Sequence, residues 1–117
     1  MKLAVIASGE VYAKRIADYL PSGVTELVTG DADAIRRYVE ECAAAMGLPL
    51  ATFAALEDAY DPSDAVPAHH RQMIDYADEL LLFWDGHDPA AEPTAVCAEK
   101  RDMNIHLVIL EPEKDLL

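Results

Sequence analysis

Short apolar runs alternate with longer amphipathic segments along the chain. The apolar runs are bounded by turn-forming residues and predict strands over residues 2–8, 25–29, 49–55, 79–84 and 105–110. The segments between them carry apolar residues at helical spacing and predict helices over residues 11–20, 31–46, 64–77 and 92–103. Gly47 is the expected C-cap of the second helix. We also expect an acidic loop over residues 56–62 and a frayed tail over 111–117.

This alternation predicts the fold. Continuous apolar strands separated by helices are typical of a parallel sheet that is covered on both faces. Right-handed crossovers then give an α/β fold, a Rossmann-like three-layer sandwich with a doubly wound, mainly parallel five-stranded sheet. The 117 residues fit a single domain over 1–117. In such sheets ligands bind outside the carboxyl ends of the strands, so the loops at that edge are the candidates for a site.

The charge balance excludes some classes of partner. Nine Lys and Arg against 22 Asp and Glu give a net charge of −13. Binding to nucleic acid or to anionic lipid needs a basic face, so we expect neither. No apolar run approaches the ~18 residues needed to span a bilayer, and the first residues lack the pattern of a signal peptide. We therefore expect a cytoplasmic protein, with Cys42 and Cys97 as reduced, packed thiols.

The loops at the carboxyl ends of the strands hold acids rather than a phosphate cradle. Each has one glycine (Gly9, Gly30 or Gly86), and neither G-x-G-x-x-G nor G-x-x-x-x-G-K-[ST] is present. The acids are Glu10, Asp31, Asp33, Asp85, Asp88 and Glu92. Three of them also suit the first turns of the helices that they begin. A phosphate would meet several like charges, at about 1–4 kcal/mol for each close pair, unless a divalent cation bridges it.

Histidines and carboxylates near these loops are donors that suit zinc. The set comprises His69, His70, His87, Asp85, Asp88 and Glu92. Its spacing matches no closed metal motif, and the adjacent His69 and His70 are expected to point to different faces of a helix. His70 shares its helical phase with Met73, which predicts a half-buried, hydrogen-bonded imidazole. We therefore assign no metal ligand, and the cofactor stays open, a divalent cation included.

Nucleophilic catalysis has little support in the sequence. Ser8 ends the first predicted strand, but the chain has no G-x-S-x-G elbow around it. We assign no catalytic residue, and a binding domain is expected rather than an enzyme.

Three long stretches together resemble a known group of proteins. They are "KLAVIAS", "ELVTGDADAIRRYVEECAAAMGLPL" and "HHRQMIDYADELLLFWDGHDPAAEPTAVCAEKRDMNIHLVIL", and they cover nearly the whole chain. They resemble the SLOG superfamily of Smf/DprA-like and Lonely-Guy-like Rossmannoid proteins, above all its small stand-alone YspA/YpsA-like branch. The most specific piece is Met73, then Tyr76-Ala77-Asp78, then Phe83-Trp84-Asp85-Gly86 before a helix. The resemblance implies binding of a nucleotide or nucleotide-derived ligand, and some members hydrolyse N-glycosidic or related bonds.

The first two loops depart from the pattern of that group. After the first strand the group commonly has Gly-Ser-Arg, of which Ala7-Ser8-Gly9 keeps only the serine. After the second strand it has a Gly-Gly-Ala-Arg-Gly type of loop. Here Gly30 and Ala32 match, and Asp33 stands where the group has an arginine.

The later segments depart in the same direction. His69-His70 stand where the group often has Arg-Asn. After the fourth strand Thr94 is kept, but Pro93 replaces a glycine and the loop is longer. The loss of glycines and arginines, together with the added acids, argues against the phosphate ligand that is usual for the group.

The leading expectation is a domain that binds a small nucleotide or nucleotide-derived ligand, whose ribose hydroxyls or base amines donate to carboxylates. One alternative is a degenerate, non-catalytic domain that acts through protein contacts or as a homo-oligomer. The other is a nucleotide-processing hydrolase with Asp85 or Glu92 as general acid or base. The expected partners are this ligand and further copies of the chain. The residues expected to bind the ligand are Ser8, Gly9, Gly30, Asp31, His70, Asp85, Gly86 and Thr94.

Overall fold

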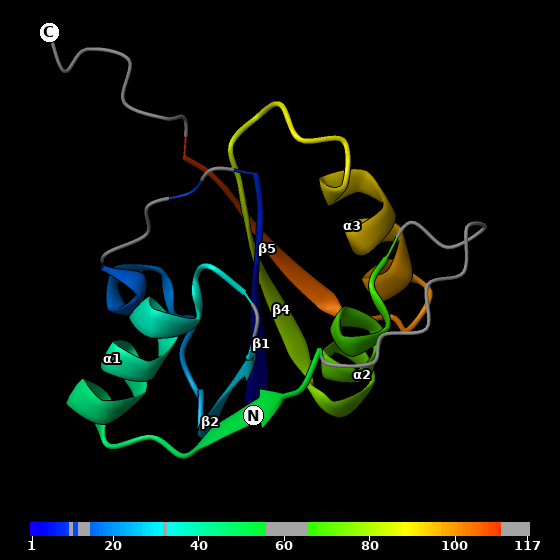
Figure 1. Ribbon diagram of the computed structural model, residues 1–117. Coiled ribbons are helices and arrows are strands. Elements are labelled where there is room, and N and C mark those ends of the chain that lie inside the picture. Colours follow the sequence, from blue (N-terminus) through cyan, green and yellow to red (C-terminus); the bar gives the residue numbers. More distant parts are fainter. Residues whose placement is uncertain (10, 12–14, 32, 56–65, 111–117) are drawn as a thin grey trace, which may run out of the picture.

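The computed structural model is a single parallel sheet with helices on both faces (Figure 1). It describes residues 1–9, 11, 15–31, 33–55 and 66–110. The strands run in the order β3-β2-β1-β4-β5 and every neighbouring pair is parallel. The elements are β1 (Lys2–Ser8), the 3-10 helix η1 (Ile16–Tyr19), β2 (Glu26–Gly30), α1 (Arg36–Met46), β3 (Leu50–Phe53), α2 (Ala68–Tyr76), β4 (Glu79–Trp84), α3 (Ala91–Glu99) and β5 (Asn104–Ile109).

The helices divide between the two faces as the direction of winding requires. η1 and α1 cover one face, and α2 and α3 cover the other (Figure 1). From β1 the chain winds to β2 and β3 on one side, and it then returns across the sheet to β4 and β5 on the other. Right-handed crossovers made in opposite directions must place their helices on opposite faces. The predicted α/β, Rossmann-like three-layer sandwich is therefore confirmed.

The core consists of two layers that share the central strands. Alternate residues of a strand point to opposite faces. In β4, Leu81 and Phe83 pack in the layer that contains η1 and α1, whereas Leu80 and Leu82 pack with Met73 of α2. The four leucine and phenylalanine side chains of β4 are at most 1% exposed. Burial on both faces explains why this strand is continuously apolar in the sequence.

The observed element boundaries differ from the predicted ones mainly at the starts of helices. α1 begins at Arg36 rather than at residue 31, because the chain first makes turns in which Asp33 N–H donates to the Gly30 carbonyl and Arg36 N–H to that of Asp33. α2 begins at Ala68, since Pro67 is extended with ψ 146°. In the first predicted helix, the described residues form only the 3-10 helix η1. The predicted acidic loop and tail lie outside the described residues.

The expected C-cap of α1 is confirmed. Gly47 caps α1 in the left-handed conformation, with φ 66° and ψ 31°. Both cysteines are free. Burial raises the pKa of the Cys42 thiol, which disfavours a reactive thiolate. Among the described residues, the helices are too short or too polar to cross a membrane.

Candidate functional site

The carboxyl ends of β1 and β4 flank the point where the winding of the sheet reverses. The chain leaves β1 toward β2 and leaves β4 toward β5, so the loops after these two neighbouring strands diverge. In open α/β sheets this crevice is where ligands bind. Ser8 is in register with Trp84, and Asp85 N–H donates to the Ser8 carbonyl at 3.2 Å. β1 and β4 therefore end side by side, and the loops after them start next to each other.

A buried carboxylate fills the space beside Gly9. Gly9 has φ +92°, and a Cβ at this position would lie 2.1 Å from Asp85 Oδ2. Asp85 is 8% exposed. Its Oδ1 accepts hydrogen bonds from the backbone N–H groups of His87 and Asp88, each at 2.8 Å. Gly86 has φ +88° inside this turn. Both glycines are thus required by the packing and the turn of the Asp85 loop.

Asp88 connects the loop after β4 with β1 and with α3. Its Oδ2 accepts a hydrogen bond from Ser8 Oγ at 2.9 Å, and its Oδ1 accepts one from Ala90 N–H at 3.1 Å. Its carbonyl accepts the indole N–H of Trp84 at 2.8 Å. Hydrogen bonds to a carboxylate are stronger than those between neutral groups. Together with the turn at Asp85, they hold the rim of the crevice in one conformation.

At the end of β2, Asp31 ties this strand to β3. Its N–H donates to the Phe53 carbonyl and its Oδ1 accepts the Ala55 N–H, both at 2.9 Å. The Asp31 carbonyl accepts a hydrogen bond from Arg36 at 2.8 Å. Asp31 is therefore occupied by interactions that join the two strands and the start of α1.

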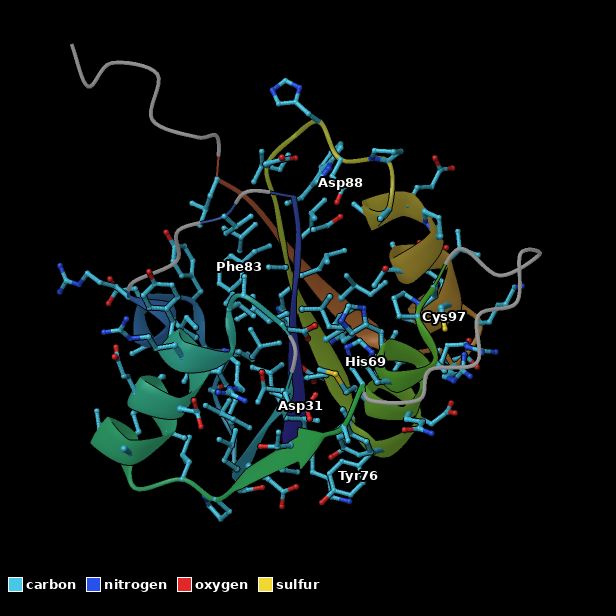
Figure 2. All side chains as sticks on the ribbon, in the orientation of Figure 1. Asp31, His69, Tyr76, Phe83, Asp88 and Cys97 are labelled. Carbon is cyan, nitrogen blue, oxygen red and sulfur yellow. The ribbon has the colours of Figure 1, made fainter. Side chains whose placement is uncertain are left out.

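Two histidines from the first turn of α2 meet the carboxylate that follows β2. Asp33 Oδ1 lies 3.1 Å from His69 Nε2 and 3.0 Å from His70 Nε2, and Oδ2 is also 3.0 Å from His70 Nε2. The two ring centroids are 4.2 Å apart. We call these three residues the Asp33 cluster. In Figure 2, His69 lies well apart from Asp88, so this cluster and the Asp85 loop are separate features.

The carboxylate of the Asp33 cluster is ionised. Burial by itself would raise the pKa of Asp33, but hydrogen bonds and charge from His70, and then from His69, outweigh it, and the pKa lies below its ordinary value. An ionised carboxylate only accepts hydrogen bonds, so each imidazole donates from Nε2. The side chains of His69, His70 and Asp33 are 7%, 13% and 15% exposed.

A pocket of about 230 Å³ lies between α3 and the carboxyl halves of β4 and β5. We call it the α3 pocket. Apolar side chains make up most of its lining, and two carboxylates, Asp88 and Glu92, are also part of it. The lining residues are Leu82, Trp84, Asp88, Pro89, Ala91, Glu92, Ala95 and Leu107.

The residues expected to bind a ligand fall into three groups. Ser8, Gly9, Asp85 and Gly86 do converge at the reversal point, where Asp85 N–H donates to the Ser8 carbonyl and the two side chains bond to the loop residues His87 and Asp88. Gly30, Asp31 and His70 lie around the end of β2. Thr94 is buried in α3, and its hydroxyl donates to the Ala90 carbonyl at 3.0 Å. None of the eight is among the lining residues of the α3 pocket.

The expectation that His69 and His70 diverge was wrong. Both imidazoles reach the same Asp33 carboxylate. They are the second and third residues of α2, and their ring centroids lie only 4.2 Å apart. A topological signal was available: α2 lies in the crossover from β3 to β4, so its first turn comes near the carboxyl ends of the strands. In the structure α2 packs against β2.

A scan against protein-family models gives no match, and a sequence search of characterised proteins gives none.

Proposed function

We propose that this domain binds a small nucleotide-derived ligand, of about nucleoside size, in the α3 pocket. The observation that carries this proposal is the lining of the pocket, in which apolar side chains and the Trp84 indole accompany two carboxylates at the carboxyl edge of the sheet. Small-molecule sites commonly combine mostly apolar walls with a few polar groups that fix orientation. A flat base would pack against Trp84, while its amines or the ribose hydroxyls would donate to Asp88 and Glu92.

Charge and size both favour a nucleoside over a nucleotide with free phosphates. The protein carries a net charge of −13, and carboxylates line the pocket itself. Each close pair of like charges costs about 1–4 kcal/mol. The pocket volume of about 230 Å³ is also below the range of about 300–1,000 Å³ that is usual for drug-sized ligands. A dinucleotide therefore fits the proposal poorly.

The resemblance to the SLOG superfamily supports the same class of ligand, since members are thought to bind nucleotide-derived molecules. We propose binding rather than hydrolysis. Asp85, the carboxylate first considered as a general acid or base, is buried and accepts two hydrogen bonds within its own loop. These hydrogen bonds stabilise the turn after β4.

A thermal-shift screen tests the proposal. The purified protein is heated with nucleobases, nucleosides, nucleotides and cyclic dinucleotides, with and without divalent cations. A nucleoside at 100 times its Kd should add about 2.7 kcal/mol of stability. Ala95→Leu should weaken the binding by at least about tenfold, because the added methylenes fill the pocket without removing a hydrogen bond.

Two acids on α3 provide a matched control. Glu92 lines the pocket, whereas Glu99, at the end of the same helix, does not. Glu92→Gln should weaken nucleoside binding and Glu99→Gln should leave it unchanged. Stabilisation that survives in Ala95→Leu would place the ligand elsewhere. No stabilisation by any nucleobase or nucleoside would sink the proposal.

Exposed apolar side chains beside the pocket favour a second candidate, contact with another copy of the chain. Leu107 and Ile109 of the edge strand β5 are 52% and 53% exposed, and Val96 of α3 is 40% exposed. Edge strands also present backbone groups that can pair with another strand. Sedimentation should then show a dimer that Ile109→Lys dissociates. A monomer at every concentration would exclude this candidate.

A further inference from the structure

We propose that Asp33, His69 and His70 form a binding site for a divalent first-row transition ion, with Zn²⁺ as the representative case. One potential ligand atom from each residue lies within 4.8 Å of the other two. In a tetrahedral zinc site with metal–ligand distances of about 2.0–2.1 Å, ligand atoms stand about 3.3 Å apart. The Asp33 Oδ1 to Nε2 distances, 3.1 Å to His69 and 3.0 Å to His70, are already close to that value.

The donor set selects the class of ion. Imidazole nitrogen with carboxylate oxygen suits zinc, iron, nickel and copper, whereas calcium and magnesium prefer oxygen ligands alone. Two histidines and one carboxylate also leave coordination positions for water or another ligand. The three residues would therefore form an open site rather than a closed structural one.

The surroundings hold the three donors in place and favour a cation. Both histidines lie in the first turn of α2, so the helix backbone fixes the spacing of the two imidazoles. The Asp33 carboxylate supplies a negative charge, and all three side chains are at most 15% exposed. The net charge of −13 further favours the approach of a cation.

Gly30 provides the room in which the cluster sits. A Cβ at this position would lie 2.5 Å from Asp33 Oδ2 and 2.8 Å from His69 Cδ2. The backbone of β2 can thus approach the carboxylate and the imidazole only because this residue has no side chain. Close packing of β2, the turn after it and α2 therefore surrounds the three donors.

An ion would take the place of the protons that now join these groups. Each imidazole donates its Nε2 proton to Asp33, and metal binding requires the neutral ring to carry its proton on Nδ1 instead. The site shares no residue with the α3 pocket. The metal proposal therefore stands or falls independently of the nucleoside proposal.

Metal titration of the intact chain tests the inference. Protein freed of metal with a chelator is titrated with Co²⁺, followed by absorption, and Zn²⁺ is measured by competition. We expect one ion per chain. Removing a second-shell partner of a metal site costs 10–100-fold in affinity, so loss of a direct ligand in Asp33→Asn, His69→Gln or His70→Gln should cost more than about 100-fold.

The remaining two of the four histidines serve as controls. His87 is exposed in the loop after β4, and His106 contacts Glu79 at 2.7 Å. His87→Gln and His106→Gln should keep the affinity of the wild type. If a cluster variant fails to fold, imidazole NMR of the wild type replaces it, and Zn²⁺ should shift the signals of His69 and His70 alone. Absence of binding, or binding that survives in the folded cluster variants, would overturn the proposal.

Discussion

Replacing Gly9 with alanine is expected to lower the free energy of unfolding by about 3–5 kcal/mol. The left-handed backbone at φ +92° contributes about 1–2 kcal/mol of this loss in a residue with a side chain. The rest, about 2–3 kcal/mol, comes from displacing Asp85, whose Oδ2 lies 2.1 Å from the new Cβ and whose Oδ1 accepts two backbone hydrogen bonds. Urea unfolding followed by circular dichroism measures the change.

Gly23 provides the matched control for this prediction. It has a similar φ of +86°, but a Cβ there would meet no atom within 4 Å. Gly23→Ala should therefore show only the cost of the backbone conformation. In addition, Asp85→Gly should cost less in the Gly9→Ala background than in the wild type, because the contact has already displaced the carboxylate. Equal costs for Gly9→Ala and Gly23→Ala would refute the assignment of Gly9 to Asp85 packing.

Replacing Asp33 with alanine is expected to cost about 2–4 kcal/mol in the absence of metal. Two imidazoles that are 7% and 13% exposed would lose their common acceptor. A buried donor without a partner costs about 1–3 kcal/mol, and some access of water to His70 reduces the sum. Denaturant unfolding in the presence of a chelator measures the effect on the protein alone.

Two further variants serve as comparisons for Asp33→Ala. Asp33→Asn keeps an acceptor oxygen in place and should cost less than alanine. Asp18→Ala removes an exposed carboxylate that pairs with Arg15, and should change stability by less than about 1 kcal/mol. If Asp33→Ala were no more costly than Asp18→Ala, the cluster would not contribute to the stability of the fold.

The central strands β1 and β4 could be predicted from the sequence because burial on both faces gives them a continuous apolar pattern. β1 and β4 have the predicted bounds, and both are buried over most of their length. The starts of the helices could not be predicted as well. Residues that suit a first turn, such as Asp31 and Asp33, serve here in the turns and contacts between β2 and α1 instead. A local preference for helix was overridden by contacts with distant parts of the chain.

The convergence of the loops after β1 and β4 could be predicted from the sequence, but the lining of the α3 pocket could not. The fold alone locates the reversal point between β1 and β4. The α3 pocket depends on volume that is missing beside small residues such as Ala91 and Ala95, and an alanine in a sequence does not reveal whether its neighbours fill the space. The Asp33 cluster depends on the direction of two adjacent side chains, which a helical periodicity alone cannot supply.

Under the proposed resemblance to the SLOG superfamily, all three residues of the Asp33 cluster stand at positions where the chain departs from the pattern of that group. Asp33 stands where the SLOG pattern has an arginine, and His69-His70 stand where it often has Arg-Asn. These three exchanged positions lie in contact with one another. Under this proposal, positions that carry arginine or asparagine in the group here carry an acid and two histidines that complement one another.

The hydrogen bonds around Asp85 and Asp88 also bear on how fast and at what entropic cost a ligand binds. Asp88 lines the α3 pocket, and before any ligand arrives it accepts hydrogen bonds from the Ser8 hydroxyl, the Trp84 indole and the Ala90 N–H, while its own N–H donates to Asp85. Ordering a loop on binding costs affinity, and a rim that is already ordered avoids that cost. Association of the proposed ligand should then follow one-step kinetics. The observed rate constant should rise linearly with ligand concentration, without the plateau that a loop closure would cause.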